Sequence, residues 1–110
     1  MRTDTIEAVG IDEGGSLWVK PAMATFPYIY REAMAVHWDA GRLRLYGPKP
    51  REWSYAAWFE QIRDAARQQG VELELGQTTS WTGIGPELQQ AITSSGSGLS
   101  SDTKADSGST

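Results

Sequence analysis

The 110-residue chain contains no cysteine and one histidine, His37. The absence of cysteine excludes disulfide bonds, thiol catalysis and cysteine-ligated zinc. A metal site would have to be built from carboxylates, and no acidic cluster has the spacing of metal ligands. We therefore expect no metal and no cofactor, and we expect side-chain packing to stabilise the fold.

The sequence also lacks a long apolar run, because no stretch approaches the ~20 consecutive apolar residues of a membrane-spanning helix. The beginning, residues 1–5, is polar and acidic where a signal peptide needs an apolar segment. A phosphate-binding loop is missing as well, since the glycines of 83–85 precede Pro86 without the Lys-Ser/Thr pair of such loops. These absences predict a cytoplasmic protein that has no membrane partner.

Acidic side chains outnumber basic ones, and the formal net charge is −4 at pH 7. This balance argues against nucleic acid or an anionic membrane as the main partner. The basic residues are nevertheless concentrated, because residues 20–51 hold six basic and two acidic side chains. That segment could form a basic face for an anionic ligand, or a solvated face that balances the acidic remainder of the chain.

Large aromatic residues are abundant, with five Trp, four Tyr and two Phe. Each aromatic side chain buries roughly 150–250 Å², which suits the core of a single small domain. We expect Trp53, Tyr55 and Trp58 to lie in this core. Trp18 and Trp81 are less constrained by the pattern around them, and either could line the rim of a pocket.

Two short runs, at 6–11 and 16–20, are rich in β-branched and aromatic residues, and glycines lie in the segment 12–15 between them. This pattern predicts a β-hairpin, because glycine supplies the positive φ that such turns need. Residues 71–75 alternate between apolar and polar side chains and predict another strand. Residues 77–81 could extend that strand past a kink at Gly76.

Residues 28–38 alternate with a period of two, which favours a strand, although the composition of 31–35 also suits a helix. The following segment, 39–41, predicts a tight turn into a second alternating run at 42–46. A two-residue loop at 40–41 gathers the apolar side chains on one face of this hairpin, namely Met34, Val36, Trp38, Leu43 and Leu45. The opposite face then carries Arg31, His37, Arg44 and Tyr46.

A joint between this hairpin and a long helix lies at 47–59. The prolines within 47–50 stop the strand, because proline lacks the N–H that a sheet requires. Ser54 is a natural N-cap, and Trp53 and Trp58 have the spacing of a hydrophobic staple. Apolar residues then recur at helical spacing until Gly70, which predicts the end of the helix.

A short second helix is predicted to begin at Pro86, with Leu88 and Ile92 on one face. From residue 94 onward the chain is rich in serine and glycine, which predicts a flexible tail at 94–110. The elements together predict one α+β domain over residues 1–93. It would contain a mainly antiparallel sheet of about five strands, one long amphipathic helix and a short C-terminal helix.

The candidate site is the polar face of the second hairpin. Arg31, His37, Arg44 and Tyr46 could bind an anionic or aromatic small molecule through charge-assisted hydrogen bonds and stacking, or a protein partner. Because an uncovered sheet face is often covered by self-association, we expect a homo-oligomer, most simply a dimer. These features favour a non-enzymatic binding or adaptor module. Single-stranded nucleic acid is a third choice of ligand, weakened by the acidic total.

An enzymatic alternative rests on His37, because histidine is suited to proton transfer near neutral pH. Asp39 is predicted on the same strand face and could orient His37 as a general base. Arg31 or Arg44 could then stabilise an anion. No serine or threonine nucleophile is predicted nearby, so we favour the binding interpretation.

Three segments carry a resemblance to a known group of proteins: Phe26–Met34, Pro48–Tyr55 and Trp58-Phe59. The chain resembles small hypothetical proteins encoded by mobile integron gene cassettes, over about residues 5–93. This resemblance implies a bacterial, cytoplasmic, stand-alone and oligomeric protein. It implies no activity and no site residues, because the functions of that group are mostly unassigned.

Overall fold

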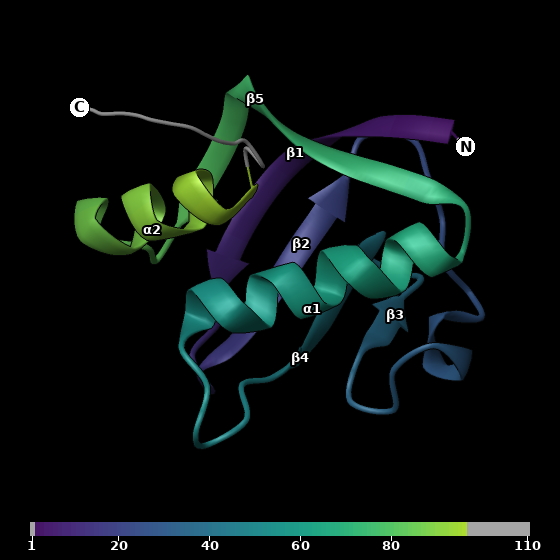
Figure 1. Ribbon diagram of the computed structural model, residues 1–110, viewed down its shortest axis with the longest axis horizontal. Coiled ribbons are helices and arrows are strands. Elements are labelled where there is room, and N and C mark those ends of the chain that lie inside the picture. The colour runs from purple at the N-terminus through teal and green to yellow at the C-terminus, as the bar shows by residue number, and fades with distance from the viewer. Residues whose placement is uncertain (1, 97–110) are drawn as a thin grey trace.

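The computed structural model describes residues 2–96 as one five-stranded sheet with two helices on the same face (Figure 1). The elements in chain order are β1 (Arg2–Ile11), β2 (Ser16–Pro21), a 3-10 turn η1 (Ile29–Arg31), β3 (His37–Asp39), β4 (Arg44–Pro48), α1 (Tyr55–Gln68), β5 (Val71–Thr82) and α2 (Pro86–Gly96). The predicted α+β class is confirmed. Helix α2 continues past residue 93 to Gly96, and the rest of the predicted tail lies outside the described residues.

The strand order is β3-β4-β2-β1-β5, and the sheet is mixed. Three neighbouring pairs are antiparallel, whereas β1 and β5 run parallel, with Arg2 opposite Val71. The sheet is thus mainly antiparallel as predicted, but it is mixed, and the prediction did not include the parallel pair. The physical reason is that α1 carries the chain back along the sheet between β4 and β5, so β5 enters in the same direction as β1 (Figure 1).

The first hairpin is confirmed, with its turn held by Asp12. The Asp12 Oδ1 atom accepts hydrogen bonds from the backbone N–H groups of Gly14, at 3.0 Å, and Ser16, at 2.9 Å. Gly15 has φ +86°, the region where glycine carries no steric cost. Strand β1 carries an irregularity between Ile6 and Ala8 in its pairing with both neighbours, so Ile6 and Val9 are both fully buried.

The start of α1 is also confirmed. Ser54 Oγ accepts a hydrogen bond from the Ala57 N–H at 3.0 Å, and the Trp53 and Trp58 rings meet edge to face with centroids 5.9 Å apart. The Trp58 indole N–H donates to the Gly47 carbonyl at 3.0 Å, so the buried polar atom is satisfied. This contact ties the helix to the end of β4.

The predicted strand at 28–38 is wrong over most of its length. Residues 29–31 form η1, and β3 is limited to His37–Asp39. Local turns replace the strand, because the Arg31 N–H donates to the Tyr28 carbonyl at 3.0 Å and the Glu32 N–H to the Ile29 carbonyl at 2.9 Å. Upstream of them, the buried Asp4 carboxylate accepts hydrogen bonds from the N–H groups of Met23 and Ala24, each at 2.9 Å. These bonds direct the loop after β2, and Ile29 enters the core.

The predicted register of the second hairpin is wrong by two residues. His37 lies opposite Tyr46 and Asp39 opposite Arg44, so the loop contains four residues and not two. Asp39 Oδ1 accepts from the N–H groups of Gly41 and Arg42, both at 3.0 Å, and these bonds stabilise the longer turn. An even shift keeps every side chain on its face. Two residues predicted on the apolar face are nevertheless exposed, Met34 and Leu43.

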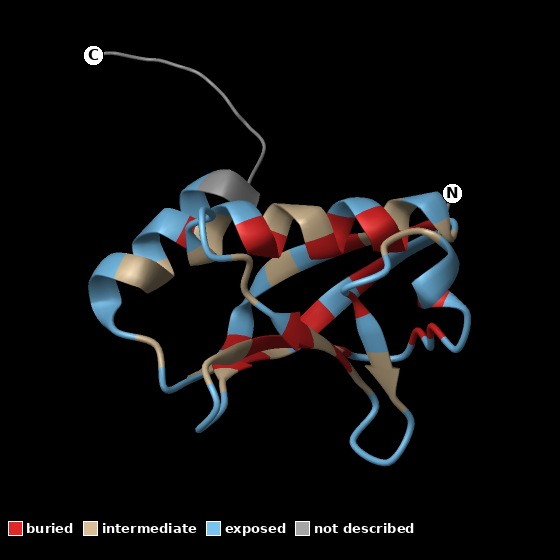
Figure 2. Cartoon of the chain, turned by 90° about the horizontal axis from the view of Figure 1, so that it is seen from below, coloured by how far each residue is buried: buried red, intermediate tan, exposed pale blue. Residues whose placement is uncertain are grey.

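The core lies between the sheet and the helices (Figure 2). Its fully buried members include strand residues and helix residues, among them Ile6, Val9, Leu17, Val19, Leu45, Leu73, Phe59, Ile62 and Ile92. The other face of the sheet carries no helix within residues 2–96 (Figure 2). This second face is the place where the candidate site lies.

Candidate functional site: the open face of the sheet

One row of cross-strand neighbours crosses the uncovered side of the sheet. His37 pairs with Tyr46, Tyr46 with Trp18, and Trp18 with Gly10. Directly paired residues point to the same side of a sheet. Their chain neighbours Leu17 and Leu45 lie in the core on the opposite side, as expected from alternation. We call the surface formed by this row, together with Lys20 and Arg44, the open face.

The centre of the open face is a floor made of one indole ring. A Cβ atom added to Gly10 would lie 2.2 Å from Trp18 Cζ2, so the ring lies directly over the glycine backbone. The Arg44 guanidinium lies over the same indole, with its Cζ atom 4.4 Å from the ring centroid. Trp18 is consequently only 9% exposed, although no helix covers it. The stack Gly10, Trp18 and Arg44 fixes the cation in one orientation.

Arg44 has no acidic partner in the described chain. Asp39 is its direct neighbour on β3, but the Asp39 carboxylate pairs with the Arg42 guanidinium at 3.3 Å. The pKa of Asp39 is lowered, chiefly by the hydrogen bond from the Arg42 backbone N–H. Within residues 2–96, Arg44 forms no ion pair, and its buried Nε has no hydrogen-bond acceptor. The cation is therefore left uncompensated.

The structure brings together three of the four predicted binding residues. His37, Arg44 and Tyr46 share the open face, and the His37 and Tyr46 rings lie 5.3 Å apart at a tilt of 36°. Arg31 lies elsewhere, in η1, where its guanidinium covers the Tyr28 ring at 4.9 Å. Whether these residues bind a ligand stays a prediction.

The geometry of a general base is not formed at His37. The side chain is exposed, and its ring contacts the Tyr46 ring. It makes no hydrogen bond or ion pair with the residues that the structure describes. The Asp39 carboxylate is bound within its own turn and pairs with Arg42. No group of three or more potential metal ligands occurs within residues 2–96, and no helix there could span a bilayer.

The sequence indicated Trp18 as a residue that could line a pocket rim, but it did not connect Trp18, Lys20 or Gly10 with His37, Arg44 and Tyr46 in one surface. The sequence does indicate the side on which Trp18 and Lys20 lie. Alternation in 16–20 puts them on one side of the strand and Leu17 and Val19 on the other. The pairing of β2 with β4 is non-local, so no local pattern in the sequence joins the two hairpins into one surface.

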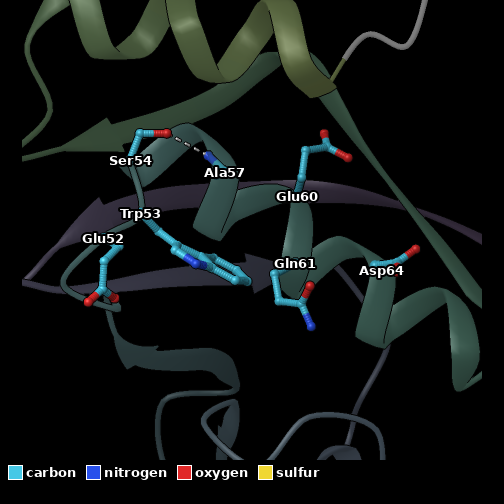
Figure 3. A pocket seen from close by; sticks show the side chains of 7 residues that line it. All are labelled: Glu52, Trp53, Ser54, Ala57, Glu60, Gln61 and Asp64. Atoms are coloured by element: carbon cyan, nitrogen blue, oxygen red, sulfur yellow. Dashed lines mark hydrogen bonds between the residues drawn. The ribbon is translucent and has the colours of Figure 1, made fainter.

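A groove of about 700 Å³ also runs along the outer side of α1 and is lined by Glu52, Trp53, Ser54, Ala57, Glu60, Gln61 and Asp64 (Figure 3). Three of its polar side chains have partners within the helix, because Ser54 caps α1 and two carboxylates form ion pairs. Glu60 pairs with Arg63 at 2.9 Å and Asp64 with Arg67 at 2.7 Å. Trp53, which lines the groove, packs against Trp58 in the hydrophobic staple at the start of α1. The groove is therefore partly formed by the residues that begin this helix.

The fold and the open face define a small α+β domain with one sheet face covered by helices and the other exposed. The family model described as Integron Cassette Protein Hfx_Cass5 matches residues 4–79, and the chain belongs to that family. A solved structure, an Hfx_Cass5 integron cassette protein from the mobile metagenome of North West Arm Sewage Outfall, is 45% identical to this chain. The match covers 87% of this chain and 97% of that chain, with a TM-score of 0.43. No curated protein matches the chain. The resemblance to integron cassette proteins is thus confirmed, and neither description carries an activity, a ligand or a partner.

Proposed function

We propose that the protein is a non-enzymatic binding module whose open face holds a small anionic molecule. The observation that carries this proposal is the state of Arg44, which is stacked on Trp18 and has no carboxylate partner in the described chain. The guanidinium lies over an aromatic ring, and its planar donors can bind two oxygens of one anion.

The surroundings of Arg44 favour an anion attached to a flat ring. Tyr46 lies on the same face and is partly exposed, so its ring is available for stacking beside the cation. Lys20 Nζ donates to the Arg42 carbonyl at 3.1 Å and adds positive charge without an acidic partner in residues 2–96. An aromatic carboxylate or aryl phosphate would satisfy both features of the open face.

The test is a titration of the ¹⁵N-labelled protein with benzoate and phenyl phosphate, followed by NMR. We expect saturable shifts at the amides of Trp18, Arg44 and Tyr46. Arg44→Ala should weaken binding by about tenfold or more, because a charge-assisted bidentate contact is lost. Arg51→Ala is the matched control, since Arg51 is an exposed arginine outside this face. Equal loss in both variants, or shifts confined to other regions, would contradict the proposal.

We also propose that the protein works as a homo-oligomer, most simply a dimer. Four of the six large hydrophobic side chains exposed in the described chain lie between residues 23 and 34: Met23, Tyr28, Tyr30 and Met34. Tyrosine, methionine and arginine are enriched at protein interfaces, and Arg31 lies over the Tyr28 ring.

Sedimentation across a dilution series tests the proposal of a homo-oligomer. A strict monomer at high concentration would exclude it, and Met34→Glu should weaken association, whereas Ala22→Glu, at an exposed alanine, should do so less.

A further inference from the structure

Strand β5 contains a large irregularity beside β1. Leu75 lies opposite Ile6 and Ser80 lies opposite Ala8, so four residues of β5 bulge out against one residue of β1. Thr79 holds the bulge in place: its Oγ1 donates to the Ile6 carbonyl at 2.7 Å and accepts from the Gly76 N–H at 2.9 Å. Thr79 is buried, and its bond to the Ile6 carbonyl is shielded from water, whereas its bond from the Gly76 N–H is only partly buried. The bulge is therefore a fixed feature of the fold.

The bulge and helix α2 enclose a hollow of about 360 Å³, lined by Leu75, Gly76, Gln77, Trp81, Gln89 and Thr93. Leu75 and Trp81 pack against the core and form its apolar wall. Gln89 and Thr93 are four residues apart on α2, so they project from one side of the helix. Neither the Gln77 nor the Gln89 side chain forms a hydrogen bond with any residue in the range 2–96.

We propose that this hollow is a binding site for a small, uncharged, planar molecule that carries an amide-type group. The Trp81 ring offers a flat apolar surface, and each glutamine carboxamide offers one acceptor oxygen and two donor hydrogens. Among residues 2–96, no charged side chain lines the hollow, so a charged ligand would lose hydration there without gaining a partner from these residues. The volume is close to the lower end of the ~300–1,000 Å³ that is usual for ligand pockets.

This site does not depend on the open face. Trp81 lies opposite Val9, a core residue on the helix side of the sheet, whereas Trp18 lies opposite Gly10 on the uncovered side. A ligand at one site therefore contacts none of the side chains that form the other. The failure of either proposal leaves the other standing.

Benzamide and benzoate form a matched pair of probes, because they share a ring and differ in charge. In an NMR titration of the ¹⁵N-labelled full chain, benzamide should shift the Trp81 indole N–H and the Gln89 side-chain amide in a saturable manner. Benzoate should leave these two signals unchanged. Gln89→Ala should weaken benzamide binding by about fivefold, the usual value of one lost neutral hydrogen bond.

The control is Gln68→Ala, at an exposed glutamine of α1 outside the hollow, which should bind benzamide as the parent protein does. Trp81→Phe keeps an aromatic wall and should retain partial binding, and circular dichroism establishes that each variant is folded. The proposal is overturned if millimolar benzamide leaves the Trp81 and Gln89 signals unmoved, if benzoate moves them equally, or if Gln68→Ala weakens binding as much as Gln89→Ala.

Discussion

Asp39 and Arg44 lie directly opposite each other on β3 and β4, yet they form no ion pair. The Asp39 carboxylate binds the N–H groups of Gly41 and Arg42 and the Arg42 guanidinium. Asp39, the acidic residue directly across the strand pair from Arg44, is thus engaged by hydrogen bonds within its own turn. The hydrogen bonds of this four-residue loop therefore leave the Arg44 cation available on the open face.

Gly10→Ala tests the floor of the open face. The new Cβ would approach the Trp18 indole to 2.2 Å, so the ring must move and the stack with Arg44 must open. We expect a loss of about 1–3 kcal/mol in the free energy of unfolding, the usual cost of overpacking, measured by urea denaturation. Benzoate binding should fall as it does for Arg44→Ala.

The control for this change is Gly14→Ala in the adjoining turn. A Cβ there meets only the Asp12 carboxylate at 3.5 Å, an ordinary contact. If Gly10→Ala bound benzoate with unchanged affinity, the Trp18 floor would have no part in binding.

Leu43→Gly should stabilise the protein. Leu43 has φ +57°, a left-handed conformation that costs an L-residue with a Cβ roughly 1 kcal/mol, and its side chain is 48% exposed. We expect the gain from relieved strain to exceed the loss of a half-exposed side chain, with a net increase of about 0.5 kcal/mol in the free energy of unfolding. Chemical denaturation measures it, and a decrease would show that Leu43 contributes packing of its own.

Glu72→Gln should remove part of the acid sensitivity of the fold. Hydrogen bonds from Arg67, together with the charges of Arg67 and Arg63, hold the pKa of Glu72 below its usual range. The stability that this carboxylate contributes is present above its unfolded pKa, near ~4.3, and is lost as the pH falls through the lower folded pKa. The variant should be less stable at neutral pH by about 1–2 kcal/mol and should lose less stability on acidification.

Thermal unfolding at a series of pH values measures this difference. Glu74→Gln is the matched control, because Glu74 is exposed on the same strand and forms no ion pair with residues 2–96. An acid profile of Glu72→Gln that coincides with the profile of the parent protein would contradict the assignment.

Asp4→Ala should destabilise the loop that follows β2. The variant leaves the N–H groups of Met23 and Ala24 without their acceptor in a largely buried position, at a cost of about 1–3 kcal/mol. Both bonds end on Oδ2, so Asp4→Asn retains an acceptor oxygen and should lose less stability. Denaturant midpoints should therefore rank parent, Asp4→Asn and Asp4→Ala in descending order. Glu7→Ala, at an exposed position of β1, should remain close to the parent.

The elements that could be predicted from the sequence are those specified by neighbouring residues. Ser54 and Gly70 mark the two ends of α1 through cap chemistry, and the glycines of 14–15 mark the first turn. The segment 28–36 forms local turns in place of a strand, in keeping with the helical composition of 31–35. The bonds that the Met23 and Ala24 N–H groups donate to Asp4 position the loop before it, and no local pattern encodes them. The register failed because Leu43 adopts a conformation that is normally assigned to glycine.

Three of the four predicted binding residues lie together on the open face, and the reason is the alternation of side chains along a strand. A two-residue shift preserves the alternation of a strand, so His37, Arg44 and Tyr46 share a face in either register. The contribution of Trp18 could not be derived, because it depends on the pairing of β2 with β4 across residues distant in the sequence.

The parallel pairing of β1 with β5 has a consequence for synthesis. Of the five described strands β1 is made before the others, but Gly10 meets its neighbour Thr82 only after β5 has been made. Contacts between distant residues are slow to form, because a long loop must close before they yield any stabilisation. Strand β1 therefore gains its β5 neighbour late, and until then one of its edges is open to pairing with another molecule.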